Sequence, residues 1–300
     1  MGENEEAITR ASGDKENMSQ TLPSLMDMLK AGMHFGHQKS RWHPKMKPYI
    51  FGVRNGVHIL DLERTSEDLA KALEYATNLV ATGKTILFVG TKRQAQAIVK
   101  AAAEDCGMPY LTERWIGGLL TNFDEAKRRL KKYKSLKLQI ESGEIEKYTK
   151  KEQIDIKKSV EKMDRYLSGL TTVDKMPDAL FIVDMRVSKT AVAEAERTNV
   201  PIIGICDTNV NPEQAAVVIP ANDDAVNSIK IITNLMAEAV KEGKEQWEKN
   251  KATMEKEMKK APVQNLEARN TEGKSSLVKA AAKPAAKAPV RRAMTKESSI

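Results

Sequence analysis

The chain has 300 residues, and Lys and Arg outnumber Asp and Glu by 49 to 41, which gives a net charge of +8. A length of this size predicts one or two domains, the 41% apolar content is enough for a buried core, and no apolar run approaches the ~20 residues of a membrane-spanning helix. Two cysteines, Cys106 and Cys206, are too few for a disulfide scaffold or a cysteine-based zinc finger, and the acidic N-terminus lacks the apolar stretch of a secretory signal. We therefore expect a soluble cytosolic protein with no membrane partner.

The first predicted elements are a short helix and a hairpin. Residues 24–31 favour a helix that is stopped by Gly32. Residues 49–61 alternate between apolar and polar side chains around Asn55-Gly56, a pair typical of the tight turn between two antiparallel strands.

The following segments predict a sheet of parallel strands. A helix is expected to begin at Thr65, with Asp68 as its capping partner, and to end at Gly83. The further elements are strand 85–90, helix 93–106, strand 108–111, strand 179–184, helix 188–199, strand 201–206, strand 217–220 and helix 225–243. Short, continuously apolar strands that alternate with helices indicate an α/β fold in which helices cover both faces of the sheet.

A helical insertion interrupts this alternation at residues 122–171. Asn122 with Glu125, and Thr149 with Glu152, are capping pairs that predict the starts of two amphipathic helices. Apolar residues at near-heptad spacing predict that the helices pair as an antiparallel coiled coil. The insertion carries fourteen basic and nine acidic residues, so its outer face is either a partner surface or an ordinary solvated face.

The charge pattern predicts four regions. Residues 1–17 read as a disordered acidic leader, 18–121 and 172–243 as a discontinuous α/β domain, 122–171 as the coiled-coil hairpin, and 244–300 as a basic, largely disordered tail. The tail holds fourteen basic residues against seven acidic ones, and such a segment binds polyanions without specificity.

The most informative window is 28–60, which contains no acidic residue although 30% of the chain is charged. It holds all four histidines, Trp42 and a set of basic residues, namely Lys30, Lys39, Arg41, Lys45, Lys47 and Arg54. Trp42 is suited either to stacking on a base or to anchoring its loop. His34, His37 and His43 have a spacing compatible with a metal site, but the window offers no carboxylate or thiolate to complete one, and contact with phosphate is the alternative. We assign no metal and no cofactor from the sequence.

Two further places could receive an anion. The Gly90-Thr91-Lys92-Arg93 loop joins a strand to a helix N-terminus, where free N–H groups attract phosphate, and Arg114 stands beside Trp115 and a glycine pair. Asp184 and Asp207 close apolar strands, but no base or metal set in the sequence pairs with them. The chain lacks a phosphate-binding loop and a dinucleotide fingerprint, so no catalytic residues are assigned.

Several blocks together resemble one family. They are HFGHQKSRWHPKMKPYIFGVRNGVHILDL, FVGTKRQA, ERWIGGLLTNF, PDALFIVDM and NVPIIGICDTNVNP, and they span about residues 20–242. Their order is similar to that of ribosomal protein S-two of the bacterial small subunit. The resemblance implies a flavodoxin-like parallel sheet with an inserted coiled-coil hairpin, and a structural, non-enzymatic role in translation. It implies a ribosome-bound protein on the solvent side, between head and body, in contact with small-subunit rRNA and neighbouring ribosomal proteins, and involved in docking protein S-one.

Backbone recognition by basic side chains is the expected mode of RNA binding, since they neutralise phosphates and release counterions. The predicted RNA-binding residues are Lys39, Arg41, Trp42, Lys45, Lys47 and Arg54, followed by Lys92, Arg93 and Arg114, and then by Lys131 and Lys132. There are two competing hypotheses. One is an enzyme that acts on a small phosphate-containing ligand, whereas a ribosomal protein is expected to have no small-molecule substrate. The other is a coiled-coil adaptor that binds only proteins.

Overall fold

The computed structural model describes residues 22–260. Of these, residues 22–250 belong to one compact unit, and a second unit begins at Lys251, of which the structure describes only the helical start. The predicted leader 1–17 and most of the predicted disordered tail lie outside the described residues. No helix within 22–260 is both long enough and apolar enough to cross a membrane.

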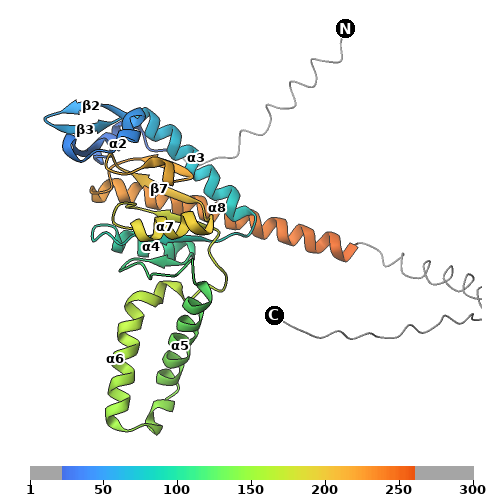
Figure 1. The fold of residues 1–300 in the computed structure, drawn as a ribbon. Coiled ribbons are helices and arrows are strands. Elements are labelled where there is room, and N and C mark those ends of the chain that lie inside the picture. Colours follow the sequence, from blue (N-terminus) through green and yellow to red (C-terminus); the bar gives the residue numbers. More distant parts are fainter. Residues whose placement is uncertain (1–21, 261–300) are drawn as a thin grey trace, which may run out of the picture. The chain divides into compact units, whose positions relative to one another are not determined.

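The centre of the unit is a five-stranded parallel sheet (Figure 1). Its strands are β4 (Ile86–Val89), β5 (Tyr110–Leu111), β6 (Ala179–Ile182), β7 (Ile202–Cys206) and β8 (Val217–Pro220). The spatial order is β5-β4-β6-β7-β8, in which the chain first moves outward from β4 to β5 and then reverses to β6. This is the flavodoxin-like order, so the predicted α/β fold is confirmed.

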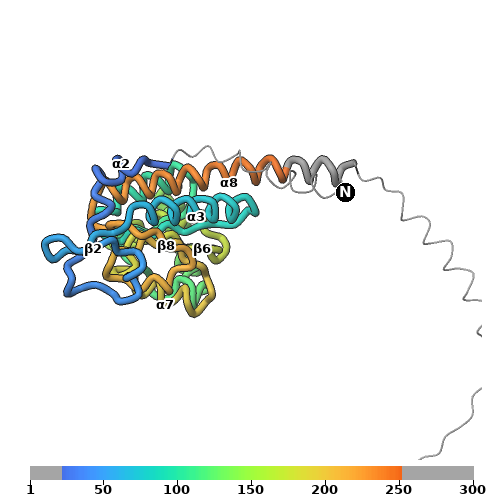
Figure 2. The backbone as a smooth tube through the Cα atoms, turned by 90° about the horizontal axis from the view of Figure 1, so that it is seen from above, coloured from blue at the N-terminus to red at the C-terminus, as the bar shows by residue number. Residues whose placement is uncertain are grey.

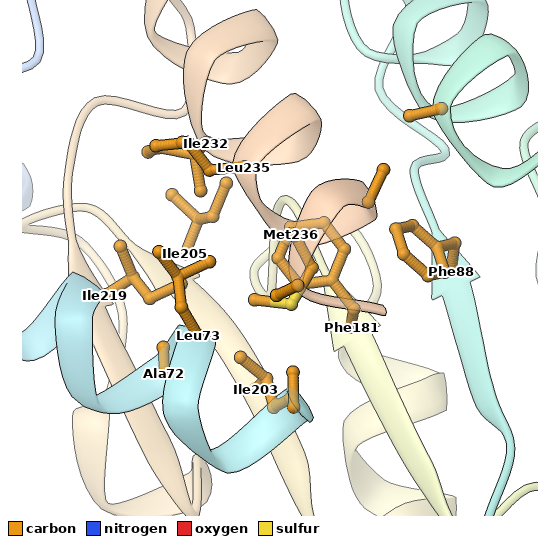
Figure 3. Close-up of a cluster of buried hydrophobic side chains, with 14 of the residues drawn as sticks. Ala72, Leu73, Phe88, Phe181, Ile203, Ile205, Ile219, Ile232, Leu235 and Met236 are labelled. Carbon is orange, nitrogen blue, oxygen red and sulfur yellow. The ribbon is translucent and has the colours of Figure 1, made fainter. Parts of the chain in front are cut away.

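Four helices cover the sheet. They are α3 (Leu62–Ala81), α4 (Gln96–Cys106), α7 (Lys189–Thr198) and α8 (Val226–Lys260). Side chains alternate between the two faces along each strand, so that Phe88 and Phe181 join the core under α3 and α8 while Leu87 and Leu180 join the core on the α7 side. Figure 3 shows Phe88 and Phe181 beside Met236 of α8, and their rings meet edge-on with centroids 5.2 Å apart.

Helix α8 lies beside α3 (Figure 2), and the hydroxyl of Thr77 donates a hydrogen bond to the carbonyl oxygen of Ala239. The sequence predicts that this helix ends at Gly243, but it continues to Lys260. Gly243 instead serves close packing, because a Cβ there would lie 2.7 Å from the carbonyl oxygen of Thr77. A glycine in a helix contact is read as a stop signal when only the sequence is known.

A second, antiparallel sheet is formed by residues that come before the parallel sheet in the sequence. The predicted hairpin is present as β2 (Ile50–Arg54) and β3 (Val57–Leu60), with Asn55 and Gly56 at positive φ in the turn. The structure adds β1 (Phe35–Gln38), which pairs antiparallel with β3 and which the sequence analysis missed. A short helix, α2 (Leu25–Lys30), leads into it as predicted.

The insertion between β5 and β6 consists of helices α5 (Phe123–Glu141) and α6 (Lys150–Leu167), which lie side by side (Figure 1). Tyr133 is fully buried between them, and its hydroxyl donates a hydrogen bond to Asp164 of α6. The two helices are therefore present, while their description as a coiled coil and as a separate region stays a proposal.

The capping of two helices differs from the prediction, and one of them, α3, also begins at another residue. Helix α3 begins at Leu62, because Asp61 accepts a hydrogen bond from the N–H of Glu63 and acts as its cap. The hydroxyl of Thr65 donates instead to the carbonyl oxygen of Pro220, at 2.6 Å. Asn122 stands at the N-cap of α5 without a capping hydrogen bond from its side chain, whereas Thr149 forms the complete predicted capping box of α6.

Candidate nucleic-acid interface

The first candidate surface is formed by residues 39–54, here called the basic segment. Two short 3-10 helices, Lys39–Arg41 and Pro44–Tyr49, lead into β2. The predicted basic residues of the segment are all exposed, namely Lys39, Arg41, Lys45, Lys47 and Arg54. All five side chains are therefore accessible to a partner, and their role in RNA binding stays a prediction.

The basic segment is attached to the parallel sheet at defined points. The N–H of His43 donates to the carbonyl oxygen of Thr208 at 2.7 Å, just beyond the end of β7. The side chain of Met46 is completely buried and packs into the core on the α7 side of the sheet. Lys45 forms an ion pair with Glu213, which lies in the loop between β7 and β8. The segment thus presents its charges from a backbone that is fixed to the parallel sheet near its middle.

Trp42 occupies an intermediate position. It is half-buried, and its ring lies 5.2 Å from that of His58 in a tilted arrangement. His58 is buried, and burial, with a smaller contribution from the charge of Lys39, lowers the pKa of its imidazole. The tryptophan therefore anchors the segment on one side and keeps part of its ring in solvent.

A second candidate surface is a groove between the 114–117 loop and the two inserted helices. Its lining includes four basic side chains, Arg114, Arg129, Lys132 and Lys162, together with the rings of Trp115 and Tyr166. We call it the basic groove. It brings together Arg114 and Lys132, two predicted RNA-binding residues that lie on different elements, whereas Lys131 is exposed on α5 and is not among the lining residues.

Glu194 of α7 holds the wall of the basic groove in place. Its carboxylate is buried and accepts hydrogen bonds from Trp115 Nε1 at 3.0 Å, Gly118 N at 2.8 Å and Leu120 N at 3.1 Å, with longer bonds from Thr121. Burial by itself raises the pKa of Glu194, but these donors together outweigh it and leave the pKa below its ordinary value. The adjacent Arg114 stays exposed, so the glutamate positions the loop and not the cation.

Sequence reasoning missed several of these residues. Lys162 and Tyr166 face Arg114 only because α6 returns along α5, and no local pattern signals that return. Glu194 is one of two glutamates in the amphipathic helix α7, and its single sequence signal is a position between apolar residues on the buried face.

The predicted anion site at residues 90–93 has a different environment. Lys92 is only 14% exposed and contacts three carboxylates, Asp223 at 2.8 Å, Asp224 at 2.6 Å and Asp184 at 3.3 Å. Its positive charge is therefore already balanced, and an added phosphate would meet a surplus of negative charge. Arg93 remains exposed.

The three histidines of the predicted cluster make separate contacts in the structure and do not form a common metal site. His43 accepts a hydrogen bond from the N–H of Lys45, and the ring of His34 packs at 4.0 Å from that of Phe35. Within residues 22–260, the one group of three side chains able to hold a metal ion contains His37 with Asp207 and Asp223.

Comparison with known proteins relates this arrangement to a ribosomal family. The chain matches the family model described as Ribosomal protein S2 over residues 28–243. It is similar to the small ribosomal subunit protein uS2 of Coprothermobacter proteolyticus, with 48% identity over 222 residues that cover 74% of this chain and 83% of that protein. The basic segment, the basic groove and both sheets lie inside the matched region.

Proposed function

This chain belongs to the ribosomal protein S2 family, and we propose that it binds small-subunit rRNA through the basic segment and the basic groove. Members of this family are structural components of the small ribosomal subunit and not enzymes. Membership implies contact with rRNA and with other ribosomal proteins, on ribosomes in the cytoplasm. The surfaces that make those contacts are the subject of the proposal.

The observation that carries the proposal is the acid-free basic segment. Five exposed cations stand on a stretch whose backbone is anchored by Met46 and by the hydrogen bond from His43 to Thr208. A pre-ordered cationic surface loses little conformational entropy when it binds. Each cation that contacts a phosphate releases a counterion, so affinity decreases steeply as salt increases.

The basic groove supports a second contact of a different kind. Its two aromatic rings and four cations suit an RNA segment with unpaired bases, because bases stack on aromatic rings and guanidinium groups while lysines contact the phosphates. Arg114 and Arg129 are the guanidinium groups available there. Trp115 is 8% exposed and hydrogen-bonded to Glu194, so Tyr166, at 37% exposure, is the ring that a base would meet.

Charge reversal in the basic segment tests the proposal. Arg41→Glu combined with Lys47→Glu alters two exposed residues outside the ion pair of Lys45, and we expect weaker assembly into small subunits at an unchanged Tm. Binding of the purified protein to small-subunit rRNA should lose affinity, and the slope of log K against log salt should become shallower by about one to two. Assembly is read by sedimentation at low magnesium, probing the small-subunit fractions for this chain.

The matched control reverses two exposed lysines outside both surfaces. Lys84→Glu with Lys230→Glu produces the same change in net charge at exposed positions. Assembly and salt slope should remain near wild type in this control. If both double variants weaken RNA binding equally, the interaction depends on net charge alone, and the basic segment is not the binding surface.

The proposal extends to the position of the protein in the subunit. We place it on the solvent side, between head and body, where it contacts neighbouring ribosomal proteins and supports docking of protein S-one. The support is an exposed apolar groove between α2 and β2 that is lined by Leu25, Met26, Leu29 and Phe51, among others. Phe51 is 80% exposed and Met26 is 60% exposed, and exposed apolar groups gathered in one patch are typical of a protein contact.

Polar substitution in the apolar groove tests this part separately. Phe51→Ser with Met26→Ser should reduce the amount of protein S-one that co-sediments with small subunits, while the amount of this chain in them stays constant. Leu138→Ser, at a residue of α5 that is 64% exposed, is the control for loss of an exposed apolar side chain. Unchanged recovery of protein S-one in the double variant would contradict the docking proposal.

A further inference from the structure

The basic groove holds positive charge that its surroundings do not neutralise. Its four cations come from three elements, with Arg114 in the loop after β5, Arg129 and Lys132 on α5, and Lys162 on α6. Arg129 shares its charge with Glu125, at 3.5 Å, whereas the other three cations form no ion pair within residues 22–260. None of the described residues that line the groove is acidic. An anion in the groove would therefore meet uncompensated charge from three separate elements.

The rest of the lining is apolar or aromatic, apart from one glycine. It consists of Trp115, Ile116, Met163, Tyr166 and Leu167. The groove has a volume of about 550 Å³, within the range of about 300 to 1,000 Å³ that is usual for ligand sites. Phosphate alone is recognised by cations and N–H groups and makes no use of an apolar floor. The combination therefore indicates a ligand that is anionic and also carries a flat, apolar part.

The walls of the groove are fixed by contacts behind them. Glu194 holds the indole of Trp115 by the hydrogen bond at 3.0 Å. On the other side, Tyr133 of α5 is fully buried and its hydroxyl donates a hydrogen bond to Asp164 of α6. This bond fixes the two helices relative to each other, and with them the lining residues that flank it in the sequence. A site formed before binding loses less conformational entropy when its ligand enters.

We propose that the basic groove binds one unpaired purine nucleotide of RNA, with its base stacked on Tyr166 and the flanking phosphates on Arg114, Lys132 and Lys162. This inference rests on the proposed binding of RNA by the groove and specifies what enters it. Tyr166 is 37% exposed, so part of its ring is open to a base. Bases stack on aromatic side chains in single-stranded RNA, and a purine offers the larger stacking area.

The apolar floor distinguishes an unpaired nucleotide from a duplex. In paired RNA the faces of the bases are covered by their neighbours in the stack, and the base edges in the deep major groove are out of reach of side chains. A duplex would place phosphates on the cations and leave the floor uncovered. An unpaired residue presents the face of its base together with the phosphates on either side of it. Selectivity for the unpaired form is therefore expected from the floor and not from the cations.

Gly117 keeps the groove open. It is an exposed lining residue, and a Cβ built on it would meet no atom within 4 Å. Its φ is not positive, so its backbone conformation accepts other residues. A larger side chain at this position would occupy space beside the groove without removing a charge. Gly117 is thus a specificity-determining position, and it offers a steric test that leaves the electrostatics unchanged.

A free mononucleotide has the same chemistry as an unpaired residue of RNA. The three unpaired cations lie on three different elements, which is more than the phosphate of one mononucleotide needs. An RNA chain supplies a phosphate on each side of the unpaired base. RNA is therefore the source that we assign, and AMP serves as the competitor that distinguishes the two sources.

The test compares two labelled RNA hairpins with identical stems, one of which carries a single unpaired adenosine. Binding to the purified full-length chain is measured by fluorescence anisotropy at physiological salt, where non-specific binding is weak. The wild-type chain should bind the hairpin with the unpaired adenosine about tenfold more tightly, and Tyr166→Ala or Gly117→Val should each reduce this ratio below about twofold. Tyr148→Ala, at an exposed tyrosine of the same insertion outside the groove, should keep the ratio of the wild type. Lys132→Glu should weaken the binding of both hairpins.

Equal affinity of the wild-type chain for the two hairpins would overturn the inference. Lys132→Glu then shows whether the proposed function fails with it. Weaker binding of both hairpins in this variant would leave the groove as a surface for the RNA backbone, whereas unchanged binding would remove the groove from RNA recognition altogether. Displacement of the hairpin by an equal concentration of AMP would overturn the assignment to RNA. Circular dichroism checks each fold, and if Tyr166→Ala fails to fold, Gly117→Val decides the question.

Discussion

The contact of Glu194 with the 115–121 loop leads to a sharp prediction about stability. Glu194→Ala removes a buried carboxylate that accepts three short hydrogen bonds, from Trp115, Gly118 and Leu120. Trp115 and Leu120 are 8% and 3% exposed, so water reaches their N–H groups poorly after the change. The variant therefore loses the acceptor and leaves two buried donors without a partner.

The cost follows from those two donors. A buried donor without a partner costs about 1 to 3 kcal/mol, and hydrogen bonds to a charged acceptor are stronger than neutral ones. The half-buried N–H of Gly118 is partly hydrated and adds less. We therefore expect Glu194→Ala to reduce the free energy of unfolding by about 3 to 5 kcal/mol. Because the loop forms one wall of the basic groove, RNA binding should weaken as well.

Urea denaturation followed by tryptophan fluorescence and by circular dichroism measures this loss. The matched control is Glu196→Ala, on the same helix at an exposed position that accepts a hydrogen bond from Gln214, and it should cost less than about 0.5 kcal/mol. A loss below about 1 kcal/mol in Glu194→Ala would refute the reasoning, because it would mean that the donors of the loop find other partners.

Three further predictions concern the same domain. Although burial opposes it, the hydrogen bonds to Glu194 hold its pKa below its unfolded value of about 4.3. The stabilisation from its charge is therefore present above that value and is lost as pH falls through the folded pKa, so the free energies of unfolding of wild type and Glu194→Gln should converge as pH falls below about 4.3 in urea titrations. Thr65→Val removes the hydroxyl that donates to Pro220 and should cost about 1 to 2 kcal/mol by urea denaturation, and a cost near zero would contradict the role of that bond. Gly90→Ala places a Cβ 2.5 Å from Cγ2 of Val99 and should cost about 1 to 3 kcal/mol, and calorimetry should show partial recovery when Val99→Ala is added.

Much of the fold was predictable because its signals are local. Strands such as residues 85–90 and 201–206 are short and continuously apolar, and helices stand between them, which is sufficient to indicate a parallel sheet covered on both faces. The Asn55-Gly56 pair and the Thr149 capping box also depend on neighbours within a few residues. Each of these features is confirmed by the structure.

The basic segment was also visible in the sequence, because all its charges lie on one continuous stretch. No tertiary information is needed to see that residues 28–60 contain no acid. The pairing of β1 with β3 was not visible, since Phe35–Gln38 has no turn signal that links it to a partner strand. The continuation of α8 beyond Gly243 was not visible because a local signal was misleading. A glycine indicates a helix stop when only its neighbours are considered, but Gly243 packs closely against α3.

What the sequence by itself determined is thus the order and type of most elements and the single basic stretch, which depend on contacts between near neighbours in the chain. Only the tertiary structure decided which distant side chains meet: Arg114 with Lys162 in the basic groove, Glu194 with Trp115, and His37 with Asp207 and Asp223. The physical reason is that each meeting depends on how whole elements pack. Helix α6 returns along α5, α7 packs against the 115–121 loop, and the parallel strands bring their carboxyl ends to one edge of the sheet beside β1. No local pattern in the sequence records any of these contacts.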